Sequence, residues 1–246
     1  MSVHYTRVHR HSLLFVVSAL AFITLILLAD RHGLGVQLLL GCATAAFLIY
    51  FVRYTEVDWL QIVCAIGIAT LGEVALSIGW KLYTYRHAVI PFYVPPGHGL
   101  FYAMATVTAA QPWLQRHASI IFRGVLVGGS LLAIVSLLMY GDTWGLVWWL
   151  GALVLLRFSR NRLLLSACFC YTIVLEWTGT AIGNWQWAPI VPFLGLHSAN
   201  PPAGVGILYI LVDIAVVMVS VPLAGFLARS SGYTQPMAWF GRQRVQ

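Results

Sequence analysis

Eight apolar runs follow one another along this chain, separated by short polar or proline-rich segments. They cover residues about 13–29, 34–52, 59–80, 97–113, 120–140, 143–157, 163–183 and 204–227. A helix needs about 20 apolar residues to cross a bilayer, and tilted or locally thinned arrangements tolerate fewer. With 60% hydrophobic and 9% charged residues, the composition excludes an ordinary soluble domain. We therefore predict an all-α, polytopic membrane protein with about eight transmembrane helices.

The basic residues indicate the orientation of these helices. With the N-terminus inside, the inner segments hold eleven of the 14 Lys and Arg residues, and the outer segments hold Arg31, Lys81 and Arg86. The inner set is Arg7, Arg10, Arg53, Arg116, Arg123, Arg157, Arg160, Arg162, Arg229, Arg242 and Arg244. The positive-inside rule then predicts cytoplasmic termini in the inner (cytoplasmic) membrane, with two proline-rich loops on the outer face. Because the basic residues are spread among many loops, no nucleic-acid partner is predicted.

Two segments of the chain resemble each other. The first holds Glu73, Gly79-Trp80, Pro91, Pro95-Pro96 and Tyr102, and the second holds Glu176, Gly183-Asn184-Trp185, Pro192, Pro201-Pro202 and Tyr209. This similarity predicts two parallel four-helix repeats, residues 1–113 and 114–246, within one integrated membrane domain and with a site between them. The alternative is chance, because Trp and Tyr are common wherever loops meet a membrane interface.

Three of the seven acidic residues, Glu73, Glu176 and Asp213, lie inside apolar runs that contain no Lys or Arg. Counted at about 1.5 Å per residue, all three lie roughly 10–15 Å below the outer boundary. An ionisable side chain at such a position costs several kcal/mol and is a functional candidate by default. Burial favours the protonated form, and a protonated acid beside a carboxylate is the pair that acid–base chemistry needs. The alternative is that these acids only tie helices together by hydrogen bonds.

His98 is expected at a junction between a turn and a helix, where it can serve as a base, bind a headgroup or supply one metal ligand. The chain has no HExxH or CxxC spacing, so we predict neither a metal site nor a cofactor. The aromatic and amide side chains near the two loops are predicted to bind substrate. They are Trp80, Tyr85, Tyr102, Asn184, Trp185, Trp187, Asn200 and Tyr209. The alternative is an aromatic belt at the interface, with the amides capping helices.

The two segments together resemble the integral-membrane carotenoid-modifying proteins, namely the lycopene-cyclase domain proteins and the carotenoid hydratases. The residues that carry the resemblance are Glu73…Gly79-Trp80…Tyr85…Pro91…Val94-Pro95 and Glu176…Gly183-Asn184-Trp185-Gln186-Trp187…Pro201. The resemblance implies that Glu73 and Glu176 protonate a polyene or terminal alkene without a cofactor. Where cyclase domains carry Pro-x-Glu-Glu, this chain has Pro96-Gly97-His98 and Pro202-Ala203-Gly204.

The leading hypothesis is an integral-membrane enzyme that performs acid/base chemistry on an isoprenoid or another lipid from the outer leaflet. The reaction is a protonation-initiated cyclisation, hydration or isomerisation, with Glu73, Glu176, Asp213 and His98 as catalytic residues. Two alternatives stay open. The first is a small proton-coupled transporter or permeation protein that uses the same acids as proton sites. The second is a non-catalytic membrane assembly or binding subunit.

Overall fold

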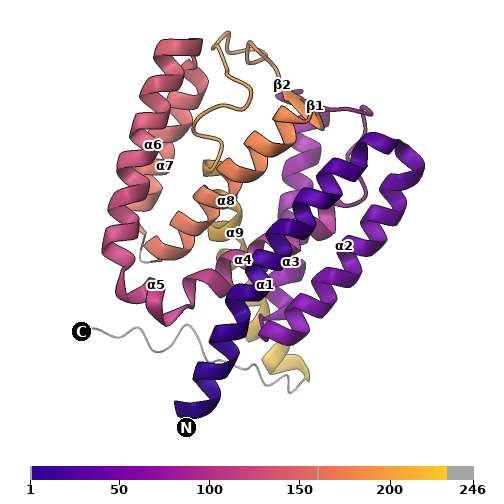
Figure 1. Ribbon diagram of the computed structural model, residues 1–246, viewed down its shortest axis with the longest axis vertical. Helices are drawn as coiled ribbons and strands as arrows, with labels where there is room; N and C mark the ends of the chain where they lie inside the picture. The colour runs from indigo at the N-terminus through magenta and orange to yellow at the C-terminus, as the bar shows by residue number, and fades with distance from the viewer. Residues whose placement is uncertain (1, 160, 232–246) are drawn as a thin grey trace.

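The computed structural model describes residues 2–159 and 161–231, with side chains described for residues 13–159 and 161–229. Three of the predicted inner basic residues, Arg160, Arg242 and Arg244, lie outside the described residues, as do the side chains of Arg7 and Arg10. The described chain is mostly helical (Figure 1). Its α-helices are α1 (Ser2–Ala29), α2 (Leu34–Thr55), α3 (Trp59–Glu73), α4 (Val94–Ala109), α5 (Pro112–Arg116), α6 (Ala118–Tyr140), α7 (Thr143–Phe158), α8 (Arg162–Ala181) and α9 (Ile207–Ser231).

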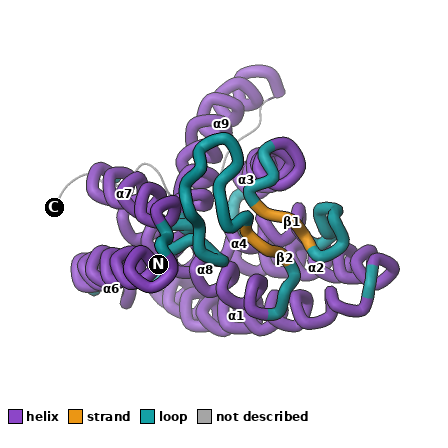
Figure 2. The backbone as a smooth tube through the Cα atoms, turned by 90° about the horizontal axis from the view of Figure 1, so that it is seen from above, coloured by secondary structure: helices purple, strands orange, loops and turns teal. Residues whose placement is uncertain are grey.

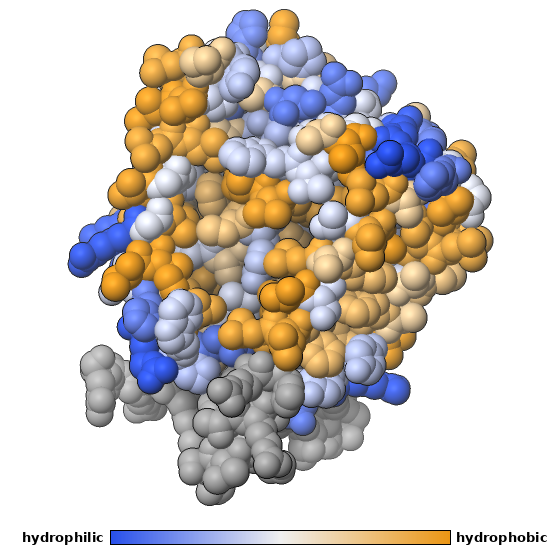
Figure 3. All heavy atoms as spheres, viewed as in Figure 1, coloured by the Kyte–Doolittle hydropathy of each residue, from blue (hydrophilic) through white to orange (hydrophobic). Residues whose placement is uncertain are grey.

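Within the described part of the chain, six helical segments are long and apolar enough to cross a membrane. They are Leu13–His32, Leu34–Thr55, Trp59–Gly79, Ala118–Tyr140, Arg162–Ala181 and Ile207–Arg229. Hydrophobic side chains cover most of the middle of the face in Figure 3, and hydrophilic ones gather toward its upper and lower rims. The predicted all-α, multi-pass membrane class is therefore confirmed. The two remaining predicted spans correspond to α4 and α7, which have 16 residues each.

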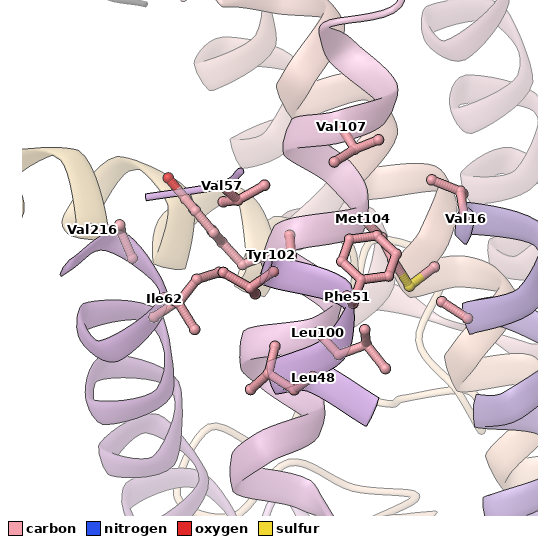
Figure 4. Packing of buried hydrophobic residues seen from close by; sticks show 14 of the residues in the cluster. Val16, Leu48, Phe51, Val57, Ile62, Leu100, Tyr102, Met104, Val107 and Val216 are labelled. Atoms are coloured by element: carbon pink, nitrogen blue, oxygen red, sulfur yellow. The ribbon is translucent and has the colours of Figure 1, made fainter. Parts of the chain in front are cut away.

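α4 is the central helix of the molecule, and it contacts α1, α2, α3 and α8. Its residues from His98 to Ala105 are all buried, as expected for a helix that is enclosed on every side. Leu100 and Met104 of α4 belong to the same buried hydrophobic cluster as Leu48 and Phe51 of α2 (Figure 4). α4 also begins three residues earlier than predicted, because Pro95 and Pro96 form its first turn, where proline is well tolerated.

The two proline-rich loops contain a feature that the sequence analysis did not predict. Their first parts form two short antiparallel strands, β1 (Tyr83–Tyr85) and β2 (Trp185–Trp187), which lie side by side in Figure 2. We call this pair the ribbon. Tyr83 faces Trp187 across it, and Tyr85 faces Trp185. In each strand the outer two residues are buried and the middle one is exposed, so the four aromatic side chains point to the interior.

Candidate functional site

Glu73, the last residue of α3, lies beneath the first strand. Tyr83 and Tyr85 point to the same side of β1, because alternate residues of a strand share a face. Both hydroxyl groups donate to Oε2 of Glu73, at 2.6 Å and 2.7 Å. The side chain of Glu73 is 14% exposed. One oxygen of this carboxylate is thus held by two donors while the other stays available.

Glu176, on α8, has the same relation to the second strand. The indole N–H groups of Trp185 and Trp187 both donate to its Oε2, at 2.8 Å and 2.9 Å. Among the described residues, Oε1 of Glu176 makes no hydrogen bond. Each acid is therefore oriented by an aromatic pair that follows it in the chain, one pair through phenols and the other through indoles. Buried carboxylates are ordinarily satisfied in this way when they keep a fixed position.

A π-helix, Val74–Gly79, compensates for a difference in length between the two segments. Glu73 precedes Tyr83 by 10 residues, whereas Glu176 precedes Trp185 by 9. A π turn closes through a hydrogen bond of five residues' span, such as that from the Trp80 N–H to the Ala75 carbonyl, and so takes up one residue more than an α turn. The π-helix therefore contains the additional residue. As a result, each glutamate accepts two hydrogen bonds on Oε2 from the aromatic pair that follows it.

The ribbon's aromatic rings form a closed layer above the two acids. The ring centroids of Tyr83 and Trp187 are 4.7 Å apart, and those of Tyr85 and Trp185 are 6.1 Å apart. All four side chains are less than a tenth exposed. Gly179 makes room for one of them, since a Cβ atom there would collide with the Trp185 ring. The small residue at 179 thus permits the close approach of an indole rather than that of another helix.

Burial and the neighbouring Glu73 carboxylate raise the pKa of the Tyr83 hydroxyl far above its ordinary value. The same two causes raise the pKa of Tyr85. Both phenols therefore remain protonated near neutral pH, and both keep their O–H donors directed at Glu73. The ribbon supplies this carboxylate with permanent hydrogen-bond donors that do not compete with it for a proton.

His98, in the first turns of α4, connects Glu73 to α9. Its Nδ1 is 2.7 Å from the hydroxyl of Tyr209, and its Nε2 is 3.5 Å from Oε1 of Glu73. When the Tyr209 hydroxyl donates to Nδ1, the ring proton is on Nε2, which lies beside the carboxylate but makes no hydrogen bond within the described residues. The three side chains lie along one path from the first acid to α9, and the second acid has no corresponding path among the described residues.

A cavity of about 330 Å³ lies beneath the ribbon. Glu73, His98 and Glu176 line it, together with Tyr209 and the four ribbon aromatics. The rest of its wall is almost wholly apolar and comes mainly from α1, α3, α4, α8 and α9, with Thr44 from α2, Leu76 from the π-helix and Tyr93 from the loop before α4. None of the residues that line it, all within the described part of the chain, is Lys or Arg. The arrangement is an apolar chamber with two carboxylic acids and one imidazole at one end.

Seven of the residues predicted for the site line this cavity: Glu73, Tyr85, His98, Glu176, Trp185, Trp187 and Tyr209. Two predicted amides have structural contacts instead. Asn184 is fully buried, and its Nδ2 donates to the carbonyl of Leu27 at the end of α1, 2.8 Å away. Asn200 accepts a hydrogen bond from the backbone N–H of Trp187 at 3.0 Å. Both amides hold the ribbon in place above the helices.

Three further predicted residues also lie off the cavity wall. The indole of Trp80 donates to the carbonyl of Pro192 at 3.0 Å, and the hydroxyl of Tyr102 donates to Gln61 at 3.2 Å. Asp213 is buried in α9, and its Oδ1 makes no hydrogen bond within the described residues. A catalytic role for Asp213 stays a prediction, and any proton transfer from it to the cavity must pass through other groups.

The prediction omitted several cavity residues, among them Tyr83, Tyr93, Phe101 and Phe22. Tyr83 was within reach of sequence reasoning, because Tyr83-x-Tyr85 repeats the spacing of Trp185-x-Trp187 at the corresponding place in the second segment. That alternation is typical of a strand with two side chains on one face. Tyr93 and Phe101 carry no such local signal, since their position depends on how α4 packs.

The described residues contain no group of three or more His, Cys, Asp or Glu side chains arranged to hold a metal ion. Comparison with models of known protein families, with curated proteins and with solved structures gives no match to this chain.

Proposed function

We propose that this chain is an integral-membrane enzyme that performs acid/base chemistry on an isoprenoid or another lipid. The observation that carries the proposal is the pair Glu73 and Glu176, each oriented by two aromatic donors, at one end of an apolar cavity. A cavity with such walls favours an apolar ligand. Two carboxylic acids that share this space can exchange roles as proton donor and proton acceptor.

The proposed reaction is a protonation-initiated cyclisation, hydration or isomerisation. One carboxylic acid transfers its proton to a carbon of a C=C bond, whose π electrons form the new C–H bond and leave a carbocation. The faces of the four ribbon aromatics stabilise this positive charge. The cation then loses a proton to the other carboxylate, or it is attacked by water, which releases a proton. No proton or electron is gained or lost overall, so the reaction needs no redox cofactor.

The proposal assigns different parts to the two acids. Oε1 of Glu73 lies beside the imidazole of His98, which connects it to Tyr209. Glu73 can therefore exchange protons with α9 between turnovers, whereas Glu176 exchanges protons only with the substrate or with water in the cavity. We assign the initial protonation to Glu73 and the final proton removal to Glu176. Glu176 then releases its proton to water in the cavity, and Glu73 takes up a proton from water by way of His98.

The proposed topology has eight membrane-spanning helices in two parallel repeats, residues 1–113 and 114–246, with both termini cytoplasmic in the inner membrane. The antiparallel ribbon supports it, because two equivalent segments related by a two-fold axis along the membrane normal would meet as antiparallel strands. The matched bonds to Glu73 and Glu176 support the same relation. In this arrangement the ribbon lies on the outer face and the substrate comes from the outer leaflet.

The resemblance to carotenoid-modifying membrane proteins agrees with this chemistry, and we propose a linear polyene as the first substrate to test. The purified protein is incubated with linear polyenes in D₂O, and the products are analysed by mass spectrometry. An enzyme of this kind introduces deuterium into a cyclised, hydrated or isomerised product. The Glu176→Gln variant, checked for folding by thermal unfolding, should form none.

The same preparation separates the proposal from the alternatives. A proton-coupled carrier would move a solute into liposomes under a pH gradient and leave it chemically unchanged. An assembly subunit would tolerate both Glu73→Gln and Glu176→Gln. Unchanged polyenes in D₂O, together with unaltered lipids and pigments in cells that lack the protein, would overturn the enzymatic proposal.

A further inference from the structure

The closed ribbon raises the question of how a ligand reaches the two acids. Tyr83, Tyr85, Trp185 and Trp187 are each less than a tenth exposed, so the cavity has no open path through its aromatic layer. On the opposite side, α4 fills the centre of the molecule, with Leu100, Phe101 and Met104 nearly inaccessible. A ligand therefore has to approach from the side, between helices.

The wall formed by α3 and α9 differs from the rest. Ile68 and Gly72 line the cavity from α3, and Leu76 lines it from the π-helix that continues α3. Leu208, Leu211 and Val212 line it from α9. Leu211 is 47% exposed although it belongs to the cavity wall, which places it at a rim where the cavity meets the outer surface. Ile26 and Leu27, on the α1 side, are buried.

A glycine widens this wall at the level of the acids. Gly72 directly precedes Glu73, and a Cβ atom added to it would meet no other atom within 4 Å. Close helix packing is therefore not the reason for a glycine at position 72. The carbonyl of Pro192 accepts a hydrogen bond from the indole N–H of Trp80. This bond holds the second loop next to the end of the π-helix that follows α3.

We propose that a linear apolar chain enters the cavity sideways from the bilayer, through the opening between the outer halves of α3 and α9 at Gly72 and Leu211. This inference rests on the proposed function and names its substrate class more closely. Because the wall is almost wholly apolar and its acids and imidazole, Glu73, Glu176 and His98, lie together at one end, the reacting end of the chain is the end without a polar head. The remainder of a longer molecule stays in the bilayer.

The test uses a linear C20 polyprenol that carries a photoreactive diazirine at the end remote from its hydroxyl. The full-length protein in lipid nanodiscs is irradiated with this probe, and the labelled peptides are identified by mass spectrometry. The wild type should be labelled on cavity residues of β1, β2 or α8. Gly72→Phe should reduce this labelling at least tenfold, because the ring obstructs the opening. Gly67→Phe is the matched control: Gly67 is on the same helix, also has open space around its Cβ, is not a cavity residue and should leave labelling unchanged.

A second variant keeps the test decisive if Gly72→Phe does not fold. Leu211→Ala enlarges the opening and should speed labelling by about twofold or more, whereas Met218→Ala, also on the outside of α9, should not. Equal labelling of Gly72→Phe and Gly67→Phe, or no effect of Leu211→Ala, overturns the lateral opening. Cavity labelling that depends on Gly72, without deuterium incorporation into any polyene, supports the opening and contradicts the proposed chemistry.

Discussion

Tyr83 and Trp187 face each other across the ribbon with their ring centroids 4.7 Å apart, and they donate hydrogen bonds to different carboxylates. The residue that donates to Glu73 therefore packs against the residue that donates to Glu176. A change in the orientation of one acid must be transmitted to the other through two packed aromatic rings. The two acids belong to one site for this reason, although residues 73 and 176 are 103 positions apart in the chain.

The two ribbon tyrosines should make the folded protein sensitive to alkaline pH. Their pKa values are raised in the folded state by burial and by Glu73, so the neutral phenols stabilise the fold fully below the unfolded pKa of about 10. This stabilisation is lost as the pH rises above that value. We expect Tm to fall above about pH 10, and Tyr83→Phe/Tyr85→Phe to fall less steeply. Parallel pH profiles for the variant and the wild type would contradict this assignment.

Gly179→Ala should disturb the second acid without unfolding the protein. The added methyl group displaces the Trp185 ring and weakens its hydrogen bond to Glu176. We expect activity to fall at least tenfold and stability to fall by about 1–3 kcal/mol, the range for overpacking. Gly124→Ala, on α6, has open space around its Cβ and serves as the control. Turnover and Tm measured on both variants check the prediction.

Asp142 should be among the most important residues for stability. This fully buried N-cap of α7 accepts hydrogen bonds from the Ser136 hydroxyl and from the backbone N–H groups of Gly145, Ala199 and Ala203. Asp142→Ala leaves several buried donors unpaired, and we expect a loss of about 3 kcal/mol or more. Asp58→Ala removes the N-cap of α3, whose side chain accepts one hydrogen bond, and should cost about 1 kcal/mol. Thermal unfolding in detergent measures both, and equal losses would contradict the proposed role of Asp142.

Tyr209→Phe tests the path from Glu73 to α9. The substitution removes the hydroxyl that fixes His98 and leaves the aromatic ring in place. If His98 returns protons to Glu73, turnover should fall at least fivefold and the pH dependence of kcat should shift, while KM stays nearly constant. His98→Gln should produce the same shift. An unchanged pH profile with a lower Tm would indicate a purely structural contact.

The sequence was sufficient to predict the membrane class and the positions of the long helices. A helix that crosses the bilayer needs a long run of apolar residues, and such runs are visible in the hydropathy of the sequence. The two glutamates stood out for the same reason. The depth of Asp213 matched theirs, but depth measures only the position along a helix axis. The side chain of residue 213 projects about 100° away from those of residues 212 and 214, so it can leave a wall to which Val212 belongs.

The hydropathy of the sequence did not predict the ribbon. Its strands have three residues each, and each strand finds its partner about 100 residues away in the chain. The hydrogen bonds that join Asn184 to Leu27 and Trp80 to Pro192 are also long-range. For these residues the aromatic and amide composition indicated the right part of the molecule. Only the packing of the helices separates those that face the cavity from those that support it.

The π-helix at Val74–Gly79 accommodates the one residue by which the first segment is longer than the second between its acid and its aromatic pair. A one-residue insertion in an α-helix would rotate every following side chain by about 100° and move Tyr83 and Tyr85 out of reach of Glu73. Confined to one widened turn, the insertion changes nothing beyond that turn. A gene that lacks one codon in this turn should therefore encode a regular α-helix with the spacing of the second segment, and the tyrosines should still meet their acid. We therefore expect this turn to tolerate a one-residue deletion that the neighbouring turns would not.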